Sequence, residues 1–262
     1  MVEETSAHPP GNFCWIELAT TDTGAAKDFY TGLFGWQADD MPIPDGTVYT
    51  ILRVDGKDVG ALYPLGAEQK AQGVPPNWLP YVAVPSADEA AGQAAGLGGK
   101  IVMPPFDVFD IGRMSIIQDP TGATFALWQA KTHKGAGHVN TIGGMCWHEL
   151  STNDTKVAED FYTSLFGWEA KHSANPGMEY TEWINQGKHI GGLMKLQWEA
   201  PPNWLTYFMV ESCDKSAGKA EALGGKLMVP PMDIPGTGRF SVIADPQGAV
   251  FSLFEPASKS DE

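Results

Sequence analysis

The segment "FCWIELATTDTGAAKDFYTGLFGW", residues 13–36, is written twice in this 262-residue chain. It returns as "MCWHELSTNDTKVAEDFYTSLFGW" at residues 145–168, with 16 of 24 positions identical at an offset of 132. Later segments repeat at an offset of 126, for example "GRMSIIQDPTGATFALW" at 112–128 and "GRFSVIADPQGAVFSLF" at 238–254. Repetition over this length indicates two tandem domains. We expect domain 1 at residues 11–130, a linker at 131–142 and domain 2 at 143–256.

Each copy mixes strand and helix patterns. Residues 14–20 alternate, with Cys14, Ile16 and Leu18 on one face, as in a strand. The next segment, 20–34, has Thr and Asp caps followed by apolar residues at helical spacing. A hairpin at 48–63, a strand at 81–84, a helix at 86–99 and a second hairpin at 112–129 complete the copy. The sequence therefore predicts an α+β fold with two units of strand, helix and several strands in each copy.

Composition narrows the class of partner. The formal net charge of −15 argues against nucleic acid or an anionic membrane surface. No apolar stretch approaches the ~20 residues that span a bilayer, and the first ten residues do not resemble a secretory signal. The three cysteines lack metal-ligand spacing, which is typical of reduced thiols in a cytoplasmic protein.

The "FYTGLFGW" helix end and the "DPTGATFALW" hairpin, each present in both copies, resemble the vicinal oxygen chelate superfamily of glyoxalases, bleomycin-resistance proteins and extradiol dioxygenases. The resemblance covers residues 11–256 and is greatest to the tandem two-domain actinobacterial glyoxalase-like type. It implies two βαβββ modules per domain, which form a curved half-barrel sheet with helices outside and a cavity inside. Single-domain members commonly dimerise, so a double copy is compatible with a monomer that is a pseudo-dimer, or with a homodimer.

The resemblance also implies a divalent metal held by His and Glu side chains. The matching positions carry Trp15 and Trp147, Gly60–Ala61 and Gly191–Gly192, Leu79 and Leu205, and Ala126 and Ser252. None of these is an ordinary metal ligand. The six histidines are His8, His133, His138, His148, His172 and His189, so domain 1 has none unless the tail or the linker supplies one. We expect no metal cofactor in the usual site; a divalent metal is compatible with domain 2 only, with His189, Glu149 and Glu182 as the best available donors.

Glu17 and Glu149 occupy the same place in both copies, two residues after Trp15 and Trp147. Alternation puts each carboxylate on the face of its tryptophan, which the resemblance makes the cavity side. A carboxylate beside an indole suits a catalytic base or a ligand contact. The alternative is a partly solvated glutamate bonded to neighbouring backbone.

Duplicated aromatic side chains give a second signal. The residues that fall on predicted cavity faces are Trp15, Tyr81, Trp128, Trp147, Tyr207 and Phe254. Aromatic stripes are common in cores, but apolar walls with a few polar groups also describe a small-molecule pocket. Together with Glu17 and Glu149 they are the predicted ligand-binding set, suited to a flat or cationic molecule.

Arg113 and Arg239 follow a glycine in both copies. Each could clamp an anionic substrate group, or pair with Asp119 or Asp245 and hold the hairpin. His148 falls on the helix-facing side of its strand, which favours a buried core histidine.

These patterns favour a protein that binds a small aromatic or hydrophobic molecule in half-barrel pockets without the usual metal. The alternative is a glyoxalase-like lyase or related metal-dependent enzyme with its active site in domain 2 and Glu149 or Glu17 as the catalytic base. A scaffold protein has no positive support in the sequence. The partner expected is a small molecule, not nucleic acid or a membrane.

Overall fold

The computed structural model describes residues 8–43, 46–173, 179–197 and 199–257. The helices are α1 (Thr23–Phe34), α2 (Ala67–Ala71), α3 (Ala87–Gly96), α4 (Thr155–Phe166) and α5 (Cys213–Ala222). The strands of the first copy are β1 (Phe13–Thr20), β2 (Gln37–Pro42), β3 (Val48–Val54), β4 (Lys57–Pro64), β5 (Asn77–Ala83), β6 (Lys100–Val108), β7 (Gly112–Gln118) and β8 (Thr124–Ala130). Those of the second copy are β9 (Met145–Thr152), β10 (Glu169–His172), β11 (Tyr180–Asn185), β12 (Lys188–Lys195), β13 (Asn203–Met209), β14 (Lys226–Ile234), β15 (Gly238–Ala244) and β16 (Val250–Pro256).

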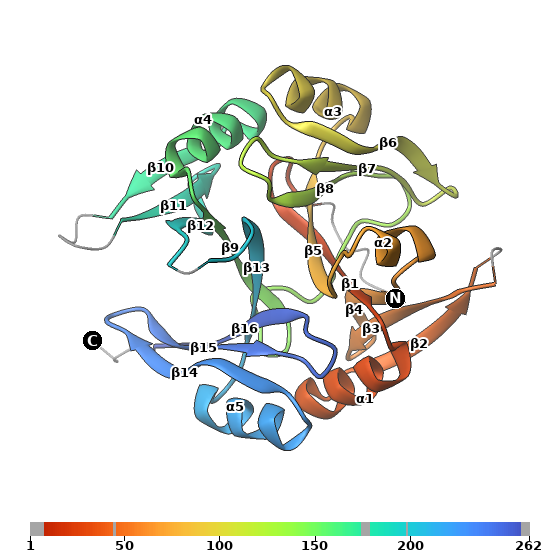
Figure 1. Cartoon of the computed structure of the whole chain (residues 1–262), viewed down its shortest axis with the longest axis vertical. Helices are drawn as coiled ribbons and strands as arrows, with labels where there is room; N and C mark the ends of the chain where they lie inside the picture. Colours follow the sequence, from red (N-terminus) through yellow and green to blue (C-terminus); the bar gives the residue numbers. More distant parts are fainter. Residues whose placement is uncertain (1–7, 44–45, 174–178, 198, 258–262) are drawn as a thin grey trace. The chain divides into compact units, whose positions relative to one another are not determined.

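Each copy builds one open eight-stranded sheet. The strand order is β2-β3-β4-β1-β5-β8-β7-β6 in the first and β10-β11-β12-β9-β13-β16-β15-β14 in the second (Figure 1). Each sheet consists of two half-sheets of four strands, β1–β4 and β5–β8 in the first copy. Within each half-sheet the first strand pairs in parallel with the last, as β1 does with β4 and β5 with β8. The remaining pairs are antiparallel hairpins. The predicted α+β class, with two units of strand, helix and several strands in each copy, is confirmed.

The residue pattern did not locate the outer strands β2, β6, β10 and β14 or the short helix α2, although the βαβββ module that the resemblance implies includes a strand at each of these four places. Most side chains of β2 and β6 are exposed, so they lack the alternation that marks a half-buried strand. In β6, Pro104 and Pro105 lie within the register shift between Met103 and Phe106 against β7. Proline is tolerated in edge strands of this kind because the missing N–H faces away from the sheet.

The compact units of the chain do not follow the two copies. Unit 1 contains residues 1–15, 79–135 and 147–205, and unit 2 contains residues 16–78, 136–146 and 206–262. Each unit thus combines one strand–helix–strand module from each copy, and β1, β5, β9 and β13 run from one unit into the other. The helix contacts agree, because α3 packs against α4 in unit 1 and α1 against α5 in unit 2.

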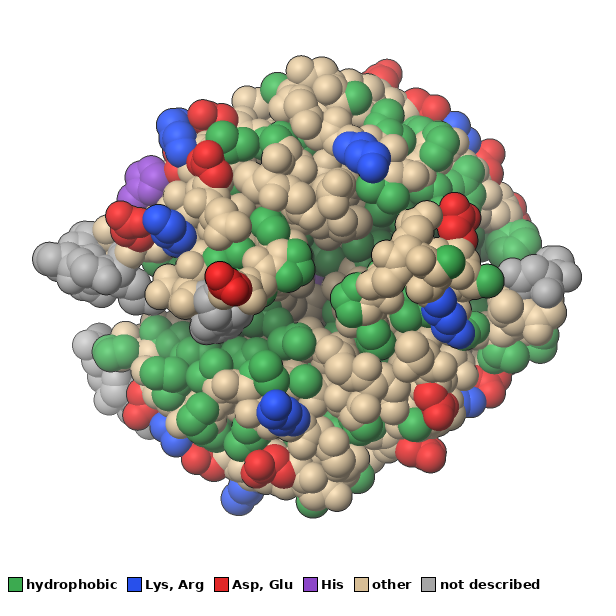
Figure 2. Space-filling view, in the orientation of Figure 1, with side chains coloured by type: hydrophobic (Ala, Val, Ile, Leu, Met, Phe, Trp, Pro, Cys, Tyr) green, Lys and Arg blue, Asp and Glu red, His purple; other side chains and the backbone are tan. Residues whose placement is uncertain are grey.

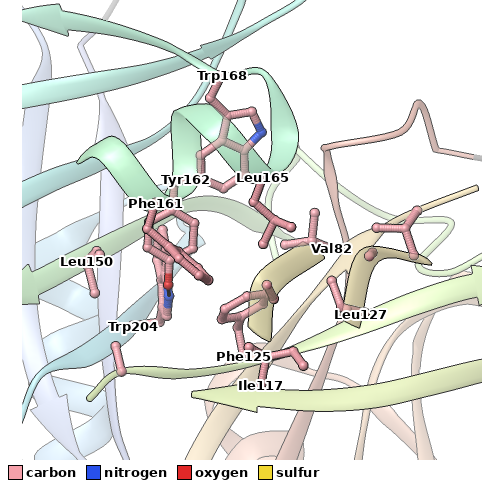
Figure 3. Packing of buried hydrophobic residues seen from close by; sticks show 14 of the residues in the cluster. Val82, Ile117, Phe125, Leu127, Leu150, Phe161, Tyr162, Leu165, Trp168 and Trp204 are labelled. Atoms are coloured by element: carbon pink, nitrogen blue, oxygen red, sulfur yellow. Dashed lines mark hydrogen bonds between the residues drawn. The ribbon is translucent and has the colours of Figure 1, made fainter. Parts of the chain in front are cut away.

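The core of unit 1 lies between these helices and the strands beneath them. Figure 3 shows Phe161 and Tyr162 of α4 close to Phe125 of β8, with ring centroids 6.3 and 5.5 Å from the Phe125 ring. Val82, Ile117 and Leu127 from the first copy and Leu150, Leu165, Trp168 and Trp204 from the second belong to the same buried cluster. Burying one such large side chain contributes roughly 1.5–3 kcal/mol. The two copies are therefore held together by a shared core.

A buried hydrogen-bond chain joins the two repeated motifs in each unit. In unit 1, Trp204 Nε1 donates to Tyr162 Oη, which donates to Asp119 Oδ2 at 2.8 Å. In unit 2 the same chain runs from Trp78 through Tyr30 to Asp245. The tyrosine of "FY" in one copy thus meets the aspartate of "DPxG" in the other. These motifs stabilise the fold and are not part of a ligand site.

The "LFGW" ending is structural for a similar reason. Gly35 has a left-handed φ of 73° and ends α1, and its N–H donates to Thr31 O. The next residue, Trp36, is buried and its Nε1 donates to Gly143 O at 2.8 Å. Trp168 makes the equivalent bond to Gly11 O in unit 1. The duplicated tryptophans at these helix ends therefore belong to the core.

Candidate functional site

The face of each half-sheet turned away from the helices carries the predicted site residues. In unit 1, Val82, Phe125 and Leu127 face the helices and belong to the core. Because side chains alternate along a strand, Tyr81 and Trp128 lie on the opposite face. We call this the open face because none of the described helices covers it, although both of these side chains are buried.

The open face of the first copy in unit 1 is aromatic. The rings of Tyr81 and Trp128 lie 6.4 Å apart, and Met114, which pairs with Trp128 across β7 and β8, accepts from Tyr81 Oη through its sulfur at 3.9 Å. His133 brings its imidazole edge-on to Trp15, with centroids 4.6 Å apart, and lies 5.8 Å from Trp128. We call Trp15, Tyr81, Met114, Trp128 and His133 the first wall. The expected linker thus contributes a side chain to it.

The first wall continues to an exposed edge. Phe106 of β6 pairs with Met114, and Met103 pairs with Ile116, so both lie in the rows of the open face. Phe106 is 39% exposed and Met103 is 41% exposed. Large apolar side chains left exposed in a row are typical of a contact surface.

Unit 2 carries the counterpart from the second copy. Tyr207 of β13 and Phe240 of β15 have ring centroids 6.5 Å apart, and Phe240 pairs with Phe254 of β16 and with Met232 of β14. We call Tyr207, Phe240, Phe254 and Met232 the second wall. Met232 is 48% exposed. Figure 2 shows hydrophobic side chains gathered over β14, β15 and β16.

The second-copy carboxylate in unit 1 is held by a tyrosine. Glu149 is buried, and Tyr180 of β11 donates its hydroxyl to Glu149 Oε2 at 2.9 Å. Trp147 Nε1 donates to the same hydroxyl at 3.0 Å. Burial, and then the charge of Glu149, raise the pKa of Tyr180 far above its ordinary value, so the phenol stays a hydrogen-bond donor. Tyr180 lies across Gly192, where a Cβ would collide with its hydroxyl.

Unit 2 contains the first-copy version of this pair. Tyr49 of β3 donates to Glu17 Oε1 at 2.6 Å. Burial first, and then the charge of Glu17, raise the pKa of the neighbouring Tyr63 to about 12. Both glutamates therefore accept hydrogen bonds from tyrosine hydroxyls of another strand in the same sheet.

The histidines of the second copy lie in two different environments. His189 is exposed at the start of β12 and forms an ion pair with Glu182. His148 is buried, as its position predicts, and its ring stacks on Phe13 at 4.0 Å. Burial lowers the pKa of His148 to about 3, so it is neutral at ordinary pH. His172 of β10 is also exposed, but it lies 3.5 Å from Glu159 of α4, on the helix side. His189 with Glu182 is therefore the exposed histidine away from the helix.

The arginines have partners other than those considered from the sequence. Arg113 forms a double hydrogen bond with Asp88 at the start of α3 and lies 3.5 Å from Asp107. Arg239 pairs in the same way with Asp214 and Asp233. The aspartates Asp119 and Asp245 are wrong as partners, because their carboxylates accept N–H groups of their own turns and the hydroxyls of Tyr162 and Tyr30. The structural role of both arginines in pinning the hairpins is supported.

The residues at the family's metal positions do not fit a metal. The indole of Trp147 is already bonded to Tyr180, and Gly192 has no room for a longer side chain. Ser252 Oγ donates to Ser241 O at 2.9 Å. Over the described ranges, no three His, Cys, Asp or Glu side chains come together closely enough to hold a metal ion. The residues present at these positions therefore support no metal-dependent step.

Comparison with known proteins decides the family. The model of the "Glyoxalase/Bleomycin resistance protein/Dioxygenase superfamily" matches residues 13–127 and again residues 136–253. The chain belongs to this superfamily. A protein named "Putative glyoxylase CFP32" from Mycobacterium tuberculosis (strain CDC 1551 / Oshkosh) is 42% identical over 96% of this chain and 97% of its own length. The "Anthracycline biosynthesis protein DauV" of Streptomyces sp. (strain C5) is 34% identical over 94% of both chains.

Solved structures of the superfamily share the fold. The Mn(II)-bound glyoxalase from Novosphingobium aromaticivorans has a TM-score of 0.67 at 14% identity, covering 94% of this chain and 82% of that one. The halotolerant catechol dioxygenase BphC has a TM-score of 0.64 at 14% identity, covering 98% of this chain and 91% of that one. The fold is thus one on which several chemistries occur, and the site residues have to define the function. Among the described helices, none is long and apolar enough to cross a membrane.

Some residues of the open faces were not singled out from the sequence. Tyr49 and Tyr180, which hold the two glutamates, occupy corresponding positions in the copies, so their repetition was an available signal. Met114 and Phe240 also correspond, but their different side chains hide the match. His133 could not have been found by repetition because the segment after domain 1 has no counterpart.

Proposed function

We propose that this protein binds a small planar aromatic or hydrophobic molecule on the open faces of its half-sheets, without the usual metal. The observation that carries the proposal is the pair of walls, one from each copy, which run from buried aromatic rings to exposed Phe106, Met103 and Met232. A wall that served only as core would be covered to its edge. Apolar surface with aromatic rings and a few polar groups is what small-molecule sites present.

The carboxylates favour a particular ligand chemistry. Glu149 and Glu17 each keep a tyrosine donor, and each is an acceptor for a hydrogen-bond donor or a cationic group on a ligand. Aromatic rings around such a carboxylate attract planar and cationic molecules by stacking and cation–π contact. The name of the DauV relative refers to anthracycline biosynthesis, and anthracyclines are planar, hydroxylated aromatic molecules. This supports hydroxylated polycyclic aromatics as the ligand class to test.

The test is a titration of tryptophan fluorescence with alizarin, a hydroxylated anthraquinone. We expect saturable quenching, and we expect Phe106→Ala to weaken binding about tenfold, since truncating a contacting aromatic side chain commonly costs more than 1 kcal/mol. Phe109→Ala is the matched control, because Phe109 belongs to the same hairpin, is 64% exposed and lies beyond the strand, in its turn. Absence of saturable quenching, or equal weakening by Phe109→Ala, contradicts the proposal.

A second candidate is a lyase whose site lies in the second copy. It is favoured by the Glu182–His189 pair, because the first copy has Ile51 and Asp58 at these positions. A histidine next to a carboxylate suits proton transfer in an enolisation. Turnover of the hemithioacetal of methylglyoxal, lost in Glu149→Gln and in His189→Asp but kept in Glu17→Gln, would support this function. Turnover kept in all three variants would remove these groups as the base.

A further inference from the structure

A cavity in unit 1 belongs to neither carboxylate pair. It has a volume of about 280 Å³ and opens where β5 and β8 end. Its lining residues are His8, Pro10, Ala83, Val84, Pro85, Trp128, Gln129, Ala130 and Lys134. It shares Trp128 with the first wall and no other member of it. Its volume is near the low end of the ~300–1,000 Å³ that small-molecule pockets occupy. A ligand of one ring is therefore the size to expect.

The cavity is formed by the segment that follows β8. Trp128 Nε1 donates to His133 O at 3.1 Å, which draws this segment back over the end of the sheet. Gly135 has a left-handed φ of 99° and lies so close that a Cβ there would collide with Cys14 O and reach within 3.0 Å of the His8 ring. The return of the chain at Gly135 places Lys134 and His8 at the same cavity. Through Lys134, the segment 131–135 thus lines this cavity as well as connecting the copies.

The lining residues of the cavity include a lysine and no carboxylate, although the chain as a whole is strongly acidic. The protein has a net charge of −15, but the side chains in the lining that carry or accept protons are Lys134 and His8. The Lys134 ammonium donates to the carbonyl oxygen of Lys131, and within the described part of the chain it forms no ion pair with a carboxylate. By contrast, the neighbouring Lys131 is paired with Asp107 at 3.0 Å.

The second copy shows that the absence of a carboxylate is specific to this cavity. Gln129 Oε1 accepts from Ala87 N at 3.0 Å and so caps the first turn of α3. In the second copy, Glu255 accepts from Cys213 N at 2.8 Å and does the same at α5. A glutamate carboxylate therefore accepts the hydrogen bond from the first N–H of this helix as well as a glutamine does. The first copy makes the same contact with a neutral side chain.

We propose that this cavity binds a small organic carboxylate with one apolar ring or branched chain. Trp128, Val84 and Pro85 provide the apolar wall, Lys134 provides the cationic end, and the His8 ring lies in the same lining. An ammonium and a carboxylate form a charge-assisted hydrogen bond, which is stronger than a neutral one. The site goes beyond the proposed function, because its ligand is an anion and the wall and glutamate sites favour neutral or cationic molecules.

The test is calorimetric titration of the full chain with benzoate, and with benzyl alcohol as the neutral analogue. We expect benzoate to bind at least about tenfold more tightly than benzyl alcohol, and Lys134→Gln to reduce benzoate affinity by at least about tenfold, a factor equal to about 1.4 kcal/mol. Gln129→Glu should reduce it as much, because it places a carboxylate in the lining without loss of the helix contact. Lys131→Gln is the matched control and should change the affinity less than about threefold, the limit of a surface ion pair.

Each other outcome overturns the assignment. No heat with benzoate, equal binding of benzyl alcohol, or equal affinity in Lys134→Gln means that the cavity is not a carboxylate site. Retained affinity in Gln129→Glu has the same meaning, provided that the circular dichroism spectrum is unchanged. Alizarin binding to the same variants separates this result from the proposed function, because that binding depends on Phe106 and not on Lys134.

Discussion

Replacing the buried His148 by isoleucine should remove much of the acid sensitivity of this protein. His148 is 3% exposed and stacks on Phe13, and burial lowers its pKa from 6.5 to about 3. The first copy has Ile16 at the same position, packed against Gly60. His148→Ile therefore introduces a side chain that the fold already accommodates there, and it removes the titrating group.

The sign follows from proton linkage. The unfolded chain binds a proton at His148 below pH 6.5, and the folded chain does not bind it until about pH 3. The contribution of the neutral His148 to the free energy of unfolding is therefore complete above pH 6.5 and is lost as the pH falls towards 3. Each pH unit in this window is worth about 1.4 kcal/mol. At pH 5 the loss from His148 is about 2 kcal/mol relative to pH 8.

Urea unfolding followed by tryptophan fluorescence at pH 8 and pH 5 measures this loss. We expect the free energy of unfolding to fall about 2 kcal/mol further in the natural protein than in His148→Ile. Ile16→Val, at the same position in the first copy, is the control, because it changes a buried side chain without adding or removing a titrating group, and its pH dependence should match that of the natural protein. Equal falls in the natural protein and His148→Ile would refute the assignment of a buried neutral imidazole.

Three further substitutions test the buried hydrogen-bond chain between the copies and the role of two glycines. Tyr162→Phe removes the hydroxyl that donates to Asp119, so the free energy of unfolding in urea should fall by about 1.5–3 kcal/mol; a loss below about 0.5 kcal/mol would contradict the buried hydrogen-bond chain. Gly135→Ala should destabilise by about 1–3 kcal/mol because of its left-handed φ and the collision with Cys14 O. Gly92 lies within α3 with no described atom near an added Cβ, so Gly92→Ala should instead stabilise the protein by about 0.5–1 kcal/mol. Thermal melts in which Gly135→Ala is more stable than Gly92→Ala would refute this interpretation of the two glycines.

Much of the fold could be predicted because its signals are local and repeated. The signals are the caps of α1 and α4, the alternation of β1 and β9, and the turn residues of the hairpins. Each of these signals lies within a few consecutive residues. The outer strands were missed because β6 is exposed on most positions and contains two prolines. Exposure removes the hydrophobic alternation by which a strand is recognised.

The candidate site was predicted only in part, for a similar reason. Alternation along a predicted strand is sufficient to place Tyr81, Trp128 and Glu149 on the open face of the sheet, turned away from the helices. The predicted partner of Arg113, Asp119, was wrong. Asp119 is close to Arg113 in the sequence, whereas Asp88 is close to it in space. Ion pairs depend on which helix start lies over which strand end, and sequence spacing does not contain that information.

The sequence by itself determined the doubling of the fold, the aromatic open faces and the lack of ordinary metal ligands at the family positions. It did so because each of these depends on residue type at a repeated local position. Only the tertiary structure decided that the "FY" tyrosine of one copy meets the "DPxG" aspartate of the other, as Tyr162 meets Asp119. It alone brought His133 onto Trp15 and Lys134 to the same cavity as His8. Such contacts join residues far apart in the chain, and they follow from packing complementarity in three dimensions, which no local period encodes.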